Sequence, residues 1–205
     1  MGKYVRDHQQ ANSQRLRDRF RQTHAEEHRL HKQGKAGPMK GLNIVLHQPE
    51  IPQNTGNIGR TCAATGARLH LIEPLGFQLN EKALKRAGMD YWHEIDVTTY
   101  IDYDDFLKRN PGAVIYYATT KAHHLYTEAA YEPGCYLMFG KESGGIPEEI
   151  LKEHPDSCVR IPMLGETRSL NLSNAAAIVL YEALRQNGFA DLRLEGELHR
   201  LHWQD

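Results

Sequence analysis

The chain has no apolar run of the roughly 18 residues that a membrane span requires, and its charged N-terminus lacks the apolar core of a signal peptide. Cysteine is scarce, and Cys62, Cys135 and Cys158 form no CxxC pair. Each lies in an apolar run, which favours a buried, reduced thiol over a reactive or metal-bound one. We therefore expect a soluble, cytoplasmic protein without disulfides, membrane attachment or a metal ion.

Two catalytic signatures are also missing. No GxGxxG fingerprint follows a predicted strand, which disfavours a Rossmann-type dehydrogenase or methyltransferase, and no Ser-His-Asp arrangement is recognisable. His24, His28 and His31 have helical spacing and would share one face, so a metal site is one interpretation. A solvent-exposed helix face is the simpler one, because nothing nearby buries the histidines or orients them.

Charge is distributed unevenly along the 205 residues, although the net charge is only -1. Residues 1–40 contain ten Lys or Arg and four Asp or Glu, and residues 1–38 carry no apolar stripe before a linker of Gly34, Gly37 and Pro38. We expect a basic, mobile arm over residues 1–38 and one domain over residues 39–205. The arm either contacts phosphates or is an extension without function.

From Leu42 onward, short β-rich runs alternate with helical segments, which is typical of an α/β domain with a mostly parallel sheet flanked by helices. The predicted strands cover residues 42–47, 69–72, 93–97, 113–118, 135–139 and 158–161. The predicted helices cover residues 55–65, 81–87, 103–108, 147–152 and 172–186, with a weaker amphipathic helix after Ala190.

The first motif, PEIPQNTGNIGRTCAATG, covers residues 49–66, follows the first strand and opens a helix. The amide groups at the start of this helix suit a phosphate. Asn57, Arg60 and Ala64 fall near one helix face, while Ile58 and Cys62 turn elsewhere. Arg60 either faces a cleft or pairs with a surface carboxylate.

The second motif, LMFGKESGGIP, covers residues 137–147. A buried strand ends at Gly140, and a loop then presents Lys141 and Glu142 before a helix that starts near Pro147. Ligands gather at the carboxyl ends of strands in open α/β sheets, so this loop is well placed for a site. A tight turn without a ligand is the alternative.

The third motif, RIPMLGETRSLNLSNAAAIVLYEALRQN, covers residues 160–187 and leads from a strand through a polar loop into an apolar helix. Main-chain groups of this loop are suited to the polar edge of a small molecule. The helix, capped by Asn171 or Ser173 and stopped by Gly188, is too apolar for a single subunit to cover. We expect part of it to lie in a subunit interface.

In this order, the three motifs closely resemble the SPOUT superfamily of S-adenosylmethionine-dependent RNA methyltransferases. The resemblance covers about residues 40–189, and the short chain is most similar to the TrmL-like tRNA (cytidine/uridine-2'-O)-methyltransferases, which act at the wobble nucleotide, position 34. It implies a SPOUT fold with a C-terminal trefoil knot, S-adenosylmethionine as cofactor, S-adenosylhomocysteine as product and a homodimer that binds tRNA.

The resemblance also implies roles for individual residues. Arg60 and Glu142 are expected in the catalytic cleft, and Tyr181 near the partner subunit. Asn57, Lys141 and Arg168 are the expected RNA contacts, with Lys121 and Arg86 as further candidates on a basic face. The expected cofactor contacts are Ala118, Gly140, Ile161, Met163, Ser169 and Leu170.

Direct methyl transfer from a sulfonium to a ribose hydroxyl needs an in-line approach and a dry pocket, but no protein nucleophile and no metal. A guanidinium has a pKa above roughly 12, so Arg60 is better suited to stabilise the developing alkoxide than to act as a base. Glu142 either orients Arg60 or accepts the proton. Two alternatives remain: a non-catalytic RNA-binding or assembly module that retains the pocket, and a 2'-O-methyltransferase that acts on ribosomal RNA.

Overall fold

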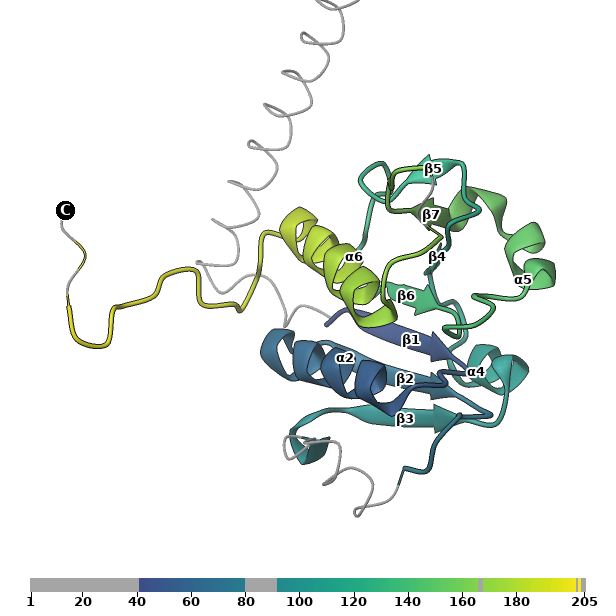
Figure 1. The fold of residues 1–205 in the computed structure, drawn as a ribbon, viewed down its shortest axis with the longest axis horizontal. Helices are drawn as coiled ribbons and strands as arrows, with labels where there is room; N and C mark the ends of the chain where they lie inside the picture. The colour runs from purple at the N-terminus through teal and green to yellow at the C-terminus, as the bar shows by residue number, and fades with distance from the viewer. Residues whose placement is uncertain (1–40, 80–91, 166–167, 202, 204–205) are drawn as a thin grey trace, which may run out of the picture. The chain divides into compact units, whose positions relative to one another are not determined.

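The computed structural model describes residues 41–79, 92–165, 168–201 and 203. A seven-stranded sheet has the order β3-β2-β1-β6-β4-β7-β5, and its paired neighbours all run parallel (Figure 1). The strands are β1 (Asn43–His47), β2 (Arg68–Ile72), β3 (Val97–Tyr100), β4 (Ile115–Ala118), β5 (His124–Leu125), β6 (Tyr136–Phe139) and β7 (Cys158–Arg160). The parallel α/β class predicted from the alternating pattern is confirmed.

Helices cover both faces of this sheet. The α-helices are α2 (Pro52–Thr65), α4 (Tyr103–Arg109), α5 (Glu148–Glu153) and α6 (Leu172–Gln186), and the 3-10 helices are η1 (Trp92–Glu94) and η2 (Pro155–Ser157). No helix among the described residues is long and apolar enough to span a bilayer. The predicted arm, its histidines, the helix expected over residues 81–87 and Arg86 lie outside the described residues.

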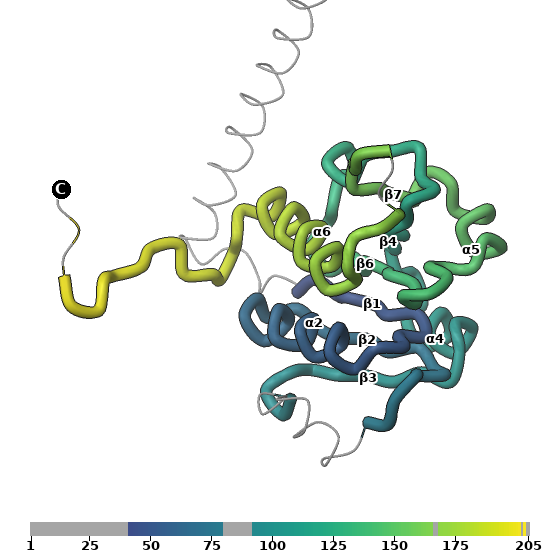
Figure 2. Tube along the Cα trace, in the orientation of Figure 1, coloured from purple at the N-terminus to yellow at the C-terminus, as the bar shows by residue number. Residues whose placement is uncertain are grey.

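Two apolar cores follow from the two-residue period of the strands. In β1, Ile44 and Leu46 pack with α2 and α6, while Val45 points to the other face and packs with Phe106 of α4 and Leu151 of α5. The two helices of the first face lie side by side (Figure 2). This arrangement buries the strands on both sides, as expected for a parallel sheet.

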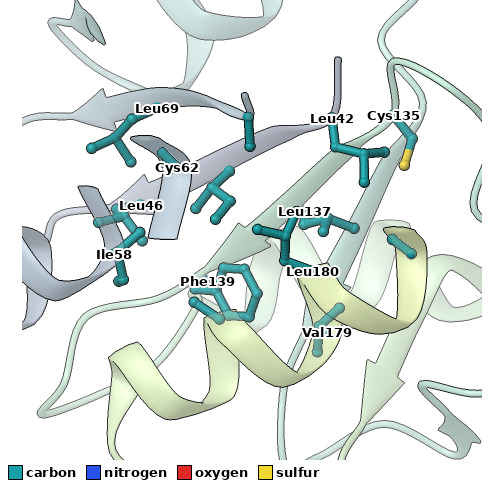
Figure 3. Packing of buried hydrophobic residues seen from close by; sticks show 14 of the residues in the cluster. Leu42, Leu46, Ile58, Cys62, Leu69, Cys135, Leu137, Phe139, Val179 and Leu180 are labelled. Atoms are coloured by element: carbon teal, nitrogen blue, oxygen red, sulfur yellow. The ribbon is translucent and has the colours of Figure 1, made fainter. Parts of the chain in front are cut away.

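Helix α6 closes the first core. Val179 and Leu180 are almost fully buried and lie over Leu137 and Phe139 of β6 (Figure 3). Burial of one such leucine stabilises the fold by about 1.5–3 kcal/mol. At its N-terminus, the Asn171 side chain accepts hydrogen bonds from the amides of Ser173 and Asn174. The predicted cap is therefore confirmed.

The C-terminal end of α6 is also as predicted. Gly188 follows the helix with a φ of 69°, a left-handed conformation that favours glycine. The buried cysteines were predicted as well, and burial raises the pKa of the Cys62 and Cys135 thiols to about 12. These thiols therefore stay protonated and act as core side chains.

Two predicted elements are wrong. The strand expected over residues 93–97 is the helix η1, and the strand begins only at Val97. Trp92 packs against Gly59 of α2, and the β-branched residues that favour a strand come later in the chain. The amphipathic helix expected after Ala190 is absent from residues 190–201, where Asp191 has a φ of 64° and Gly196 weakens the helical pattern.

Candidate functional site

A cavity of about 580 Å³ lies where β4, β6 and β7 end and where α2 and α6 begin. This size falls within the range of small-molecule sites. Its wall is apolar in part, from Phe139, Ile146, Val159, Leu172 and Ala175. The position agrees with the general rule that ligands bind beyond the carboxyl ends of strands in open α/β sheets.

The structure brings most of the predicted site residues together at this cavity. All six expected cofactor contacts line it, namely Ala118, Gly140, Ile161, Met163, Ser169 and Leu170. Glu142, Lys141, Arg168 and Lys121 line it as well. The main-chain hydrogen bonds between described residues include none from Met163 or Leu170.

Asn57 and Arg60 are not among the lining residues. Both are exposed on α2, while Ile58 and Cys62 of the same helix are buried, as the helical spacing predicts. Arg60 follows Asn54 by six residues, which is about 9 Å along the helix axis. The main chain of Arg60 therefore lies beyond the first turn of α2, which reaches the cavity, and the side chains of an α-helix tilt back toward that N-terminal end.

Gly140 is required by the close approach of two chain segments. A Cβ atom at this position would lie 1.9 Å from the main-chain carbon of Gly145 and 2.0 Å from the nitrogen of Ile146. The turn that creates this contact is closed by a 2.8 Å hydrogen bond from the Gly145 amide to the Lys141 carbonyl. Any larger residue at 140 would displace the loop that carries Glu142.

The Glu142 carboxylate is held by three donors from the start of α2. Its Oε2 accepts from the Glu50 amide at 2.8 Å, and its Oε1 accepts from the Ile51 amide at 3.2 Å and from Nδ2 of Asn54 at 2.8 Å. Helix α2 has no acidic residue in its own first turn and no side-chain cap. Glu142 thus supplies the negative charge that a helix N-terminus favours.

Asn54 extends this network to α6. Its Oδ1 accepts a hydrogen bond of 2.9 Å from Nδ2 of Asn171, whose own Oδ1 caps the helix. Each amide group is therefore used as donor and acceptor at once, which fixes its orientation. The chain Glu142, Asn54 and Asn171 joins three segments that meet at the cavity.

A second pair of hydrogen bonds joins the loop of Glu142 to the segment before α2, with donor and acceptor sides exchanged. The Glu50 carboxylate accepts from the Ser143 amide at 2.9 Å and from the Ser143 hydroxyl at 2.8 Å. These hydrogen bonds lower the pKa of Glu50, because they favour its charged form.

Positive charge predominates among the residues that line the cavity. Lys121, Lys141 and Arg168 are the lining cations, and Glu142 is the one carboxylate among the lining residues that the structure describes. Lys121 is paired with Glu148 at 2.8 Å, and both side chains are largely exposed. The cavity is therefore suited to an organic molecule with an apolar body and an anionic neighbour such as a phosphate.

Sequence reasoning missed Glu50, Asn54 and Ser143 and recognised Asn171 only as a cap. Asn54 lies within the first motif, directly before the predicted helix over residues 55–65, and this position was the available signal. Its partners lie 88 and 117 residues away, so nothing local indicates them. No group of three or more His, Cys, Asp or Glu side chains suited to a metal occurs in the described part of the chain.

Known proteins are similar to this chain in sequence and in fold. The model of the SpoU rRNA Methylase family matches residues 41–181. A tRNA (cytidine(34)-2'-O)-methyltransferase from Saccharophagus degradans is 52% identical over 150 residues, which are 73% of this chain and 97% of that protein. The enzyme of the same name from Escherichia coli K12 is 50% identical over 149 residues, which are 72% and 95% of the two chains.

Solved structures of related proteins are also similar to this chain in fold. One that gives structural insights into "the 2-OH methylation of C/U34 on tRNA" is 47% identical, covers 74% of this chain and 99% of its own, and superposes with a TM-score of 0.69. An AdoMet-bound rRNA methyltransferase from Sinorhizobium meliloti is 28% identical, covers 72% and 57% of the two chains, and has a TM-score of 0.63. From its sequence, its parallel sheet and the site at the carboxyl ends of β4, β6 and β7, the chain belongs to the SpoU methylase family, within the SPOUT methyltransferases.

Proposed function

We propose that the chain transfers a methyl group from S-adenosylmethionine to the ribose 2'-hydroxyl of a tRNA nucleotide, at the wobble position 34. The observation that carries this proposal is the convergence of all six expected cofactor contacts on one cavity of about 580 Å³. Relatives of about half-identical sequence that bear this activity in their names support the nucleotide and the position.

The cavity fits the cofactor in its chemistry. When bound, S-adenosylmethionine supplies a methyl group activated by a sulfonium. Main-chain groups of Met163 and Leu170 are suited to the polar edge of the adenine, and the apolar wall around Phe139 excludes water from the reacting centre. Ala118 leaves room for the ligand because its side chain is small.

In this mechanism the ribose 2'-oxygen would bond to the methyl carbon as the carbon–sulfur bond breaks, S-adenosylhomocysteine would leave, and the hydroxyl proton would pass to solvent water. We assign the Arg60 guanidinium to the negative charge that develops on the ribose oxygen. The Glu142 carboxylate already accepts three hydrogen bonds, so we assign it to positioning rather than to proton acceptance. No protein nucleophile and no metal takes part.

RNA binding follows from the charge around the cavity. Lys141 and Arg168 line the cavity and are assigned to phosphates, and Asn57 on the exposed face of α2 is assigned to the RNA as well. We place the protein in the cytoplasm, where its tRNA substrate is found. Phosphate contacts of this kind make affinity fall steeply with salt concentration.

We assign a homodimer to the functional state. Ile178 and Tyr181 of α6 are 37% and 46% exposed, so two large side chains of this helix are left partly uncovered in the single subunit. A two-fold interface along this side of α6 would cover both residues. The trefoil knot that the resemblance implies belongs to the same proposal.

The reaction is tested with labelled S-adenosylmethionine and unmodified tRNA. The label should appear in an alkali-resistant linkage, because a 2'-O-methyl group blocks hydrolysis of the adjacent phosphodiester. Arg60→Ala should reduce transfer by about 100-fold or more while cofactor affinity stays unchanged. Label on a base would refute 2'-O chemistry, and equal labelling of ribosomal RNA would favour the ribosomal alternative.

A further inference from the structure

We infer that Glu50 and Ser143 form a loop clasp that positions Glu142 and Asn54 for catalysis. The inference rests on the proposed methyl transfer, because it concerns the same site. Neither residue carries a role from the sequence motifs. Ser143 lines the cavity and Glu50 does not, and the role inferred for both is to position Glu142 and Asn54. Their contribution comes from the exchange of side chains between the two loops that border the cavity.

The contacts of the clasp run in both directions. The Glu50 amide donates to Glu142 at 2.8 Å, while the Glu50 carboxylate accepts from the amide and hydroxyl of the neighbouring Ser143 at 2.9 Å and 2.8 Å. The main chain of Glu50 therefore binds Glu142, and its side chain binds the next residue, Ser143. Opposed bonds of this kind fix both the distance and the rotation between the loops, which a single bond would leave free.

The loop that carries Glu50 is also held from its other side. The Gly76 amide donates to the Pro49 carbonyl at 2.9 Å, and a Cβ atom at position 76 would lie 2.6 Å from the Glu50 carbonyl oxygen. Glu50 thus lies between residue 76 and the loop of Ser143. Because residue 76 contacts this side of the loop, movement of Glu50 away from Ser143 would break the clasp and press the loop against residue 76.

The clasp leads directly to the cavity. Glu142 lies next to Ser143 in sequence and binds Nδ2 of Asn54 at 2.8 Å, and Asn54 and Glu142 both line the cavity. A shift of the Ser143 loop would therefore move two lining side chains together. Misplacement of such groups by about 1 Å can reduce a rate by up to about 100-fold.

The effect on stability is expected to be small. The two hydrogen bonds between Ser143 and Glu50 are exposed to solvent, where water competes for both groups. Loss of the clasp should therefore change the position of the loops rather than unfold the domain. Catalytic rate and local hydrogen exchange, rather than global unfolding, are the informative measurements.

The test compares Ser143→Ala, Ser143→Thr and Glu50→Gln in the full chain, with Asp96→Asn as a matched control. Asp96 is an exposed carboxylate that pairs with Arg68 at the opposite end of the sheet. Ser143→Ala and Glu50→Gln should each lower kcat for tRNA methylation by about 3- to 10-fold, with S-adenosylmethionine affinity unchanged. Ser143→Thr keeps the hydroxyl and should retain wild-type kcat, as should the control.

Ser143→Ala removes the hydroxyl donor, and Glu50→Gln replaces one of the two acceptor oxygens. The double variant should therefore be slowed by less than the product of the two single effects, because both variants weaken the same pair of contacts. Wild-type kcat in both single variants would overturn the clasp, and so would failure of threonine to retain activity. If the wild-type protein transfers no methyl group, the proposed function fails instead. In that case the clasp is tested by amide hydrogen exchange of residues 49–54 and 141–145. Ser143→Ala should accelerate this exchange, and an unchanged exchange rate would contradict the clasp.

Discussion

The Nδ2 atom of Asn171 donates a hydrogen bond of 2.9 Å to Oδ1 of Asn54, and so joins the cap of α6 to the first turn of α2. Because Nδ2 of Asn54 is directed to Glu142, the amide cannot turn over without placing two acceptors against each other. The two helices that flank the cavity are thereby held in one arrangement.

This relationship predicts different effects for two substitutions of Asn171. Asn171→Asp keeps an oxygen that caps α6, but replaces the donor to Asn54 with an acceptor. We expect a melting temperature close to that of the wild type and a kcat/KM for tRNA lower by about tenfold. Asn171→Ala should lower both, because it also removes the cap, at a cost of about 1 kcal/mol. Full activity of the aspartate variant would contradict the role of the link.

Gly140→Ala should abolish tight cofactor binding. The added carbon would meet the main chain of Gly145 at 1.9 Å, so the loop of Lys141 and Glu142 has to move. We expect S-adenosylmethionine affinity, measured by calorimetry, to fall by at least about tenfold. Gly196→Ala is the matched control, since a Cβ atom there meets nothing within 4 Å. Equal affinity of the two variants would refute the assigned pocket.

The proposed subunit interface predicts that Tyr181→Glu produces monomers. A carboxylate introduced on this side of α6 would be desolvated on association, which costs several kcal/mol when it has no partner. Leu107→Glu, at a position of similar exposure on α4, should leave the dimer intact. Light scattering coupled to size exclusion measures both, and a dimeric Tyr181→Glu protein would place the interface elsewhere.

Stability should fall as the pH drops below about 6.5. Burial lowers the pKa of His70 to about 4. Nε2 of His70 bonds Oδ1 of Asn43 at 3.2 Å, so it carries the proton, and Nδ1 accepts from the Tyr100 hydroxyl at 2.8 Å. Between pH 6.5 and pH 4 the unfolded chain binds the proton and the folded chain does not, so acid favours unfolding.

The expected loss between pH 7.5 and pH 5 is about 2 kcal/mol from this one group. Guanidinium unfolding at the two pH values measures it. His70→Gln should show a smaller pH dependence than the wild type, whereas His124→Gln, at an exposed position, should match the wild type. An unchanged pH dependence in His70→Gln would assign the acid sensitivity to other groups.

The sequence predicted the parts of the fold that depend on local patterns. The strand β1 with its apolar centre, the cap at Asn171 and the stop at Gly188 follow from hydrophobicity and turn chemistry, and all three are confirmed. The strand expected over residues 93–97 failed because the packing of Trp92 against Gly59 is a tertiary contact. The two-residue strand β5 is too short to produce a pattern.

The site was predictable only where loops follow strands. Gly140 comes directly after a predicted strand and Ile161 is the last residue of another, so their position at the carboxyl edge could be anticipated. The link between Asn54 and Asn171 spans 117 residues and depends on how α2 and α6 pack. The periodicity of apolar residues contains no information about such contacts. The trefoil knot depends on the path of the whole chain and stays a prediction.

The most direct measurement uses a tRNA that carries a single 2'-deoxyribose at position 34, compared with the same tRNA made entirely of ribose. The cavity at the ends of β4, β6 and β7 is proposed to deliver the methyl group to that hydroxyl alone. We predict one methyl group per molecule on the all-ribose tRNA, mapped to nucleotide 34 by mass spectrometry, and none on the deoxy-substituted tRNA. Equal methylation of the two tRNAs would contradict the account.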